Sequence, residues 1–216
     1  MLYENAMKIC LDAGLDLKVI KLTQSDLVLE QQISASTNYT FAILTNDNGP
    51  AGTLFNTELR LVMQDSLIAG GWGFFLLEPV SVLDATIIAR TYPNPVAFAT
   101  VGEAQALETL YNSYTKITVN KDVVGYNWHM SRHRLVPQSQ QAVGVATVEN
   151  AIANDQIDLS SDGFFPCEPN IVFIGSKGSI IELKLPAPVA VIGAAGFTRM
   201  RMHYRGLLAQ NSTIIT

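Results

Sequence analysis

The chain has 216 residues, and its 19 acidic and 14 basic side chains give a formal net charge of −5. Its two cysteines, Cys10 and Cys167, are too few for a disulfide framework, and no Cys-x-x-Cys pair indicates a metal or redox site. The N-terminus lacks the basic and apolar regions of a signal peptide, and the longest apolar runs, residues 72–77 and 186–195, are far shorter than the about 20 residues of a membrane span. We therefore expect a chain that is made in a reducing, aqueous compartment and has no membrane span.

Charged residues are scarce in this chain. They make up 15% of it, against about 25% in an average soluble domain, while hydrophobic residues reach 48%. One interpretation is a large core under a surface of Ser, Thr, Asn and Gln. The other is a surface that is largely buried against further subunits, because a monomer with so little charge disperses poorly.

Apolar residues recur at helical spacing in two segments, residues 2–13 and residues 103–112. Gly14, directly after the first segment, suits a helix C-cap. We expect two short helices, of which the first, within residues 1–14, either belongs to the domain or stands apart as an arm.

Most of the remaining chain has the two-residue period of strands. Ile181, Leu183 and Leu185, for example, alternate with Glu182 and Lys184. A period of two with one polar face is typical of an antiparallel sheet that is covered on one side. We expect about ten strands, in residues 15–19, 39–44, 58–64, 72–77, 116–119, 125–130, 142–148, 171–174, 181–185 and 199–205.

The order of these elements indicates the fold class. Strands do not alternate with helices, so a parallel α/β sheet is not expected. No linker of low complexity divides the chain. We predict an all-β fold in one domain, residues 1–216, built as an antiparallel β-sandwich with an N-terminal helix and one short inserted helix.

Two patterns superficially match catalytic or cofactor motifs. Gly193 and Gly196 follow an apolar run, but their G-x-x-G spacing is not that of a dinucleotide loop, and no acidic residue follows them. Ser113 and Lys116 match the S-x-x-K of acyl-transferring enzymes, but Ser113 follows a helical segment, whereas the serine of those enzymes opens one. We predict no catalytic residue, no cofactor and no enzymatic activity.

Two histidines are candidate metal ligands by their spacing. His129 and His133 are four residues apart, a spacing that suits zinc on a helix, but this segment has the pattern of a strand. Met130 stands where a zinc protease has Glu, and His203 is remote in the sequence. A calcium loop starting at Leu44 has the wrong residues at both ends of the register. We predict no metal site.

Basic residues gather near the C-terminus. Residues 183–216 hold four basic side chains and no acidic one. On a strand, Arg199, Arg201, His203 and Arg205 project from one face. Such a row is either the solvated outer face of a strand or meets an acidic partner, which could be another face of the same domain, a neighbouring subunit or nucleic acid. Nucleic acid is less favoured because the chain as a whole is acidic; we predict an assembly interface in which carboxylates of another chain meet this row.

The succession of segments resembles the jelly-roll coat proteins of viruses, in particular of tailless bacteriophages. The resemblance is one of rhythm and composition over roughly residues 37–210. The segments that carry it are the turn at residues 91–95, the strand at 115–120, the strand that ends at 135–137, Phe164-Phe-Pro166, the turn at 176–178, and the strands at 180–185 and 198–208. It implies a single jelly roll that self-assembles into a virion shell after synthesis in the host cytoplasm. Its partners would be copies of itself and other virion proteins, and it would have no active site.

A second hypothesis is a carbohydrate-binding module. Trp72, Tyr126 and Trp128 could stack on sugar rings if a β-sandwich exposed them. Core tryptophan is the more frequent use of such residues. A cupin-type enzyme, the third hypothesis, requires clustered His and Glu that three histidines hardly supply.

Overall fold

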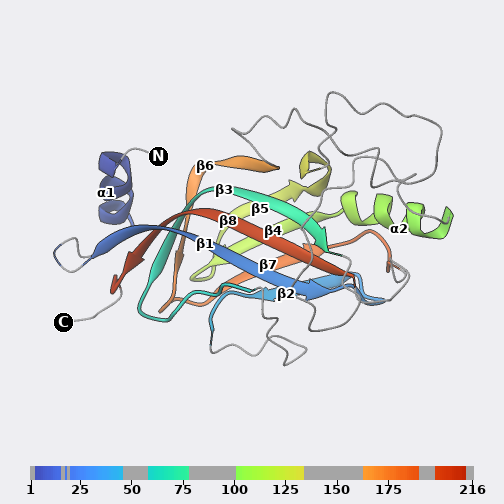
Figure 1. The fold of residues 1–216 in the computed structure, drawn as a ribbon, viewed down its shortest axis with the longest axis horizontal. Coiled ribbons are helices and arrows are strands. Elements are labelled where there is room, and N and C mark those ends of the chain that lie inside the picture. The colour runs from blue at the N-terminus through green and yellow to red at the C-terminus, as the bar shows by residue number, and fades with distance from the viewer. Residues whose placement is uncertain are drawn as a thin grey trace.

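The computed structural model describes residues 3–15, 18, 20–45, 58–77, 101–133, 163–189 and 198–212 (Figure 1). The helices are α1 (Tyr3–Asp12), α2 (Val101–Tyr111) and the short 3-10 helix η2 (Met130–His133). The strands are β1 (Lys21–Gln32), β2 (Asn38–Ala42), β3 (Ser66–Leu77), β4 (Tyr114–Val119), β5 (Asp122–His129), β6 (Phe164–Ile174), β7 (Ser179–Lys184) and β8 (Arg199–Gln210).

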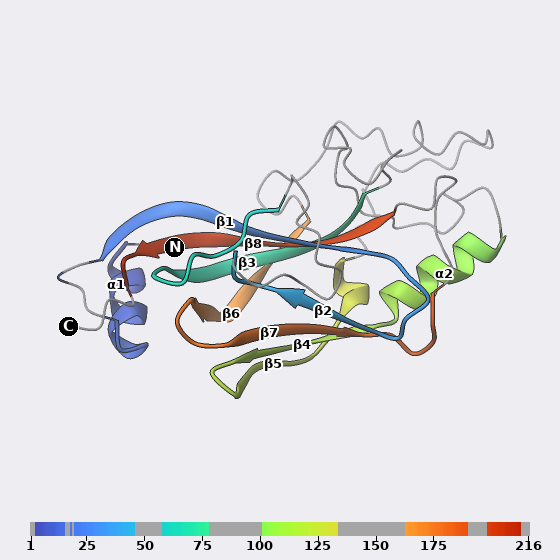
Figure 2. The ribbon, with the colours of Figure 1, turned by 90° about the horizontal axis from the view of Figure 1, so that it is seen from below.

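These strands form two antiparallel sheets of four strands each. Sheet A has the order β1-β8-β3-β6, and sheet B has the order β2-β7-β4-β5. Figure 2 shows the two sheets as stacked layers, with α1 at one end and α2 at the other. The expected antiparallel, sandwich-like β fold with two short helices is confirmed at this level.

Four of the strand pairs join the first strand to the last, the second to the second last, and so on inwards along the chain. β1 pairs with β8, β2 with β7, β3 with β6, and β4 with β5, all antiparallel. Two further pairings, β3 with β8 and β4 with β7, join these ribbons into the two sheets. Except in the β4–β5 hairpin, the paired strands are therefore far apart in sequence.

The main core lies between the sheets. Alternate residues of each strand point into it, such as Ile181 and Leu183 of β7 and Met202 and Tyr204 of β8. Helix α2 closes one end by burying Leu107 together with its neighbours. Each large apolar side chain that is fully buried contributes roughly 1.5–3 kcal/mol, which makes this core the principal source of stability.

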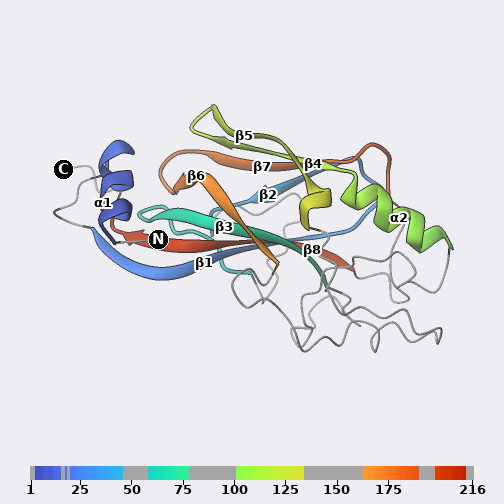
Figure 3. The ribbon, with the colours of Figure 1, turned by 90° about the horizontal axis from the view of Figure 1, so that it is seen from above.

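A smaller cluster lies on the outer face of sheet A. There Cys10 of α1 packs with Ile68, Ile174 and Ala209 from β3, β6 and β8. Sheet A is thus covered on both faces at this end, and α1 is packed on the domain and does not stand apart as an arm. Figure 3 shows α1 at the end of the layers where the β4–β5 hairpin also turns.

Two glycines and one turn depend on backbone freedom. A Cβ on Gly206 would lie 1.9 Å from the carbonyl oxygen of Ile68, next to the bulge in β3, so β8 and β3 approach closely only because residue 206 has no side chain. Gly14 has a φ of +76 after the end of α1, as its C-cap role requires. In the β4–β5 turn, Asn120 and Lys121 have φ of 50 and 70, the signature of a type I′ hairpin.

Two of the expected strands differ from the structure, and a third lies outside the described residues. Residues 59 and 61 form only isolated bridges, Leu59 with Val28 and Leu61 with Leu44, and Met63 and Gln64 already lie in a turn. Of residues 15–19, Leu15 is outside any strand and Lys18 lies in a turn, while the others lie outside the described residues. Residues 142–148 also lie outside them. The structure adds β1, which the sequence pattern did not predict.

Candidate functional site

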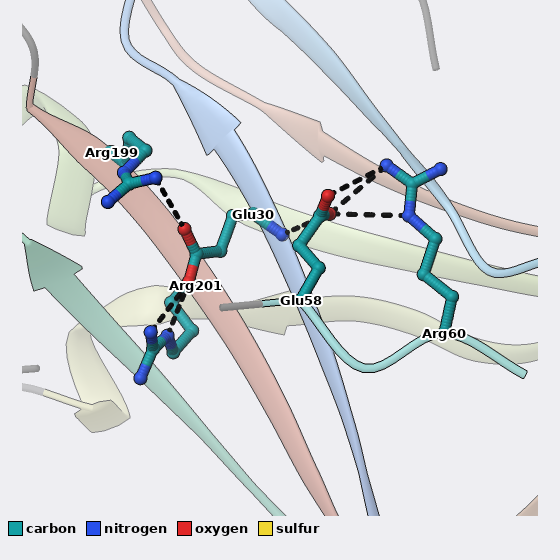
Figure 4. Close-up of polar contacts among 5 residues, drawn as sticks. All are labelled: Glu30, Glu58, Arg60, Arg199 and Arg201. Carbon is teal, nitrogen blue, oxygen red and sulfur yellow. Dashed lines mark hydrogen bonds and ion pairs between the residues drawn. The ribbon is translucent and has the colours of Figure 1, made fainter. Parts of the chain in front are cut away.

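The basic row of β8 is a cluster of ion pairs on the outer face of sheet A. Glu30 of β1 stands directly opposite Arg201 of β8. The Arg201 Nε and Nη2 atoms donate to Glu30 Oε1 at 2.9 and 2.6 Å (Figure 4). Arg199 Nη1 lies 3.2 Å from Glu30 Oε2. Glu30 is only 3% exposed and Arg199 only 2%, so these charges are part of the folded interior.

A second ion pair continues the cluster along the edge of β1. Glu58 Oε1 accepts a hydrogen bond from the backbone N–H of Glu30 at 2.9 Å and also faces Arg60, whose Nη2 lies 3.1 Å from both Glu58 oxygens (Figure 4). Leu59 exchanges two backbone hydrogen bonds with Val28, and Leu61 bonds to Ile43. Residues 58–61 therefore seal the side of the sandwich where β1 and β2 lie.

The other end of the row is more exposed. His203 Nε2 lies 3.5 Å from Asp26 Oδ1. Burial, opposed by the Asp26 carboxylate and reinforced by Arg205 and Arg201, lowers the pKa of His203 below its ordinary value. The Arg205 guanidinium lies 3.6 Å from the centroid of the Phe164 ring, a cation–π contact.

The structure confirms that Arg199, Arg201, His203 and Arg205 share one face, but it gives the first two an acidic partner within the chain. Of the three partners considered, the same domain supplies the carboxylate for Arg199 and Arg201, so they cannot present a bare charge to another subunit. Among these four, only Arg205 is exposed. The partners Asp26, Glu30 and Glu58 were not predicted; the one signal for Glu30 was a carboxylate directly after the apolar run of residues 27–29.

The two histidines considered as metal ligands lie in different environments. His133 is fully buried and its Nε2 accepts a hydrogen bond from Trp128 Nε1 at 3.0 Å. Burial lowers the pKa of His133 from 6.5 to about 3, so the ring is neutral at physiological pH. His129 is exposed and its Nδ1 lies 2.7 Å from Ser131 Oγ. No group of three His, Cys, Asp or Glu side chains that could hold a metal ion occurs in the part of the chain that the structure describes.

The aromatic residues considered for sugar stacking are mostly used inside the protein. Trp72 is 1% exposed and stacks on Tyr204, with ring centroids 5.5 Å apart. Trp128 is half-buried, and its N–H is engaged by His133. Tyr126 lies in β5, and its side chain lies outside the described residues. Trp72 therefore cannot stack on a ligand, because the core covers its ring.

Both cysteines are free and buried. Burial raises the pKa of Cys167 to about 12 and raises that of Cys10 as well. Since the thiolate is the reactive form, neither thiol is activated as a nucleophile near neutral pH.

An open groove of about 780 Å³ crosses the outer face of sheet A beside this row. Residues 70–71 of β3 and Gly206 of β8 contribute backbone to it, since glycines offer no side chain there. Charged side chains from three strands also line it: Asp26, Glu168 and Arg205. This groove is therefore both hollow and charged.

Comparisons with protein-family models, with curated proteins and with solved structures found no match in any of the three. Within the described residues, no helix has the length and apolar character needed to cross a membrane.

Proposed function

We propose that this domain is a single jelly roll that serves as a self-assembling structural subunit, and specifically as a coat protein of a virion shell. The observation that carries the proposal is the pairing of β1 with β8, β2 with β7, β3 with β6, and β4 with β5. A long antiparallel ribbon folded over on itself gives these pairs, and wrapping it gives the orders β1-β8-β3-β6 and β2-β7-β4-β5. An eight-stranded double Greek key of this kind is the jelly roll of viral capsid and lectin domains.

The surface of sheet B supports an assembly role. Among the described residues, four exposed large apolar side chains belong to its strands: Tyr114, Val123, Val124 and Ile180. Exposed apolar side chains of this kind mark surfaces where contact between copies is favourable. A contact between subunits would bury these apolar side chains and remove them from water, which is energetically favourable.

The alternative, a carbohydrate-binding module, has less support. Trp72 lies in the core, and the Trp128 N–H is occupied by His133, so two of its three stacking residues have structural roles. Jelly rolls also occur among lectins, but that is an argument from the fold alone.

The experiment is electron microscopy of the purified, untagged protein, beside its mass by light scattering over a wide concentration range. We expect closed rings or shells, or at least discrete homo-oligomers whose fraction grows with concentration. A protein that stays monomeric at the highest concentration and retains glycans on a carbohydrate array would contradict the proposal and favour the alternative.

A further inference from the structure

The groove on sheet A carries charges of both signs. Glu168 of β6 is exposed and has no ion-pair partner among the described residues. Arg205, on the opposite side of residues 70–71, is held over Phe164 and keeps its guanidinium at the groove. Pro166 and Pro169 add rigid apolar surface to the wall that β6 forms. The groove thus presents two carboxylates, those of Asp26 and Glu168, and one guanidinium on a fixed frame.

The tip of the β4–β5 hairpin presents one basic and one acidic side chain that could face the charges of the groove. Lys121 and Asp122 are adjacent and exposed, and neither has an ion-pair partner in the described part of the chain. Val123 and Val124, which follow them, are 46% and 45% exposed. The two-residue turn makes the tip narrow, and the Asn120 N–H donates to the Gly178 carbonyl at 2.9 Å, which fixes the tip to the next turn.

We propose that the groove on sheet A binds the β4–β5 hairpin tip of a second copy of this chain. In this contact Lys121 meets Glu168, Asp122 meets Arg205, and the exposed valines lie against Pro166 and Pro169. The volume of about 780 Å³ lies within the roughly 300–1,000 Å³ of sites that enclose small ligands, which is room for a few side chains of a hairpin tip. The inference rests on the proposed assembly function and names the contact that drives it.

The geometry of the contact has a consequence for the assembly. The hairpin belongs to sheet B and the groove to the outer face of sheet A, so the two surfaces are different and lie on opposite sheets. A contact between two different patches is heterologous and propagates from copy to copy until a ring or shell closes. One such contact is small and weak, so assembly gains its stability from repetition and depends on salt.

The test is a charge exchange in the full chain. Lys121→Glu and Glu168→Lys each place like charges in contact, and we expect each to weaken association by about fivefold or more in sedimentation velocity. The double variant Lys121→Glu/Glu168→Lys restores opposite charges and should associate within about twofold of wild type, since only the direction of the pair is reversed. Lys177→Glu, the same change on the adjacent β6–β7 turn, is the matched control and should behave as wild type.

All four variants change exposed side chains, so thermal unfolding should confirm that each is folded. Single variants that associate as wild type does, or a double variant weaker than both singles, would overturn the hairpin-in-groove contact while leaving the assembly function standing. An equal loss in Lys177→Glu would also overturn it, because the effect would then follow overall charge. A wild type that does not associate at all would contradict the proposed function itself.

Discussion

Glu30 of β1 and Arg201 of β8 stand directly opposite each other, and the guanidinium donates to one carboxylate oxygen at 2.9 and 2.6 Å. The other oxygen faces Arg199, and the backbone N–H of Glu30 is bound by Glu58. Through its side chain and its backbone N–H, Glu30 therefore joins the first and last strands and residues 58–61, three parts of the chain that are remote in sequence. Breaking a buried pair leaves an uncompensated charge, which costs far more than the pair contributes.

Replacement of Glu30 by Gln should therefore destabilise the fold strongly. The buried Arg199 and its neighbour Arg201 would both lose the Glu30 carboxylate, and we expect a loss of about 3–5 kcal/mol in the free energy of unfolding, measured by urea titration with tryptophan fluorescence. Glu182→Gln is the control: Glu182 is half-buried on β7 opposite Lys116, and its loss should cost about 0–1 kcal/mol. Equal effects of the two variants would mean that Glu30 is solvated in the folded protein.

His133 should make stability depend on pH in the acidic range. Its pKa is about 3 in the folded protein against 6.5 ordinarily, because burial disfavours the charged ring. Between these values the unfolded chain binds a proton that the folded chain does not, so stability falls as the pH falls, by up to about 1.4 kcal/mol per pH unit. The lowered pKa of His203 acts in the same direction.

The measurement is the free energy of unfolding at a series of pH values for wild type and for His203→Gln, which removes the second histidine. The variant should keep the His133 part of the slope. An NMR titration should show no protonation of the His133 ring between about pH 5 and 8, and a midpoint near the ordinary value would contradict its buried, neutral state.

Alternation predicted β7 and β8 correctly, but it missed β1 and wrongly predicted a full strand at residues 58–64. β7 and β8 alternate cleanly, and their faces were predicted correctly, including the row from Arg199 to Arg205. β1 was missed because Leu27 and Leu29 point into the main core while Val28 and Glu30 on the other face are also buried, so no period of two remains. Residues 58–61 lie along the edge of β1, and the sequence pattern does not contain that position either.

The same reason limits what could be predicted of the candidate site. A row of like charges implies an acidic partner, and that inference is correct for Arg199 and Arg201. Which carboxylate pairs with these arginines depends on β1 lying beside β8, and these two strands are far apart in the sequence. The groove likewise comes from the approach of β3 and β8 at Gly206, which local sequence does not reveal.

Replacement of Gly206 by Ala should disrupt that approach. The new methyl group would lie 1.9 Å from the Ile68 carbonyl oxygen, so β8 and β3 must separate, and we expect a loss of about 3 kcal/mol or more in the free energy of unfolding. Gly178→Ala is the matched control, because a Cβ there meets nothing within 4 Å, and it should change stability by less than about 0.5 kcal/mol. Similar melting temperatures for the two variants would show that the strands tolerate a side chain at position 206.

Replacement of Lys121 by Gly should separate stability from assembly. Lys121 has a φ of 70, a conformation that is unfavourable for any residue with a side chain, and glycine at this turn position should stabilise the monomer by about 0.5–1 kcal/mol. The same change removes the amine that we place against Glu168 of a second copy, so association should weaken while the melting temperature rises. Lys177→Gly is the control: Lys177 is not among the described residues with positive φ, so glycine should slightly lower stability and leave association unchanged. A Lys121→Gly protein that is more stable and still associates as wild type would show that the turn conformation is as described but that its lysine has no part in the contact between copies.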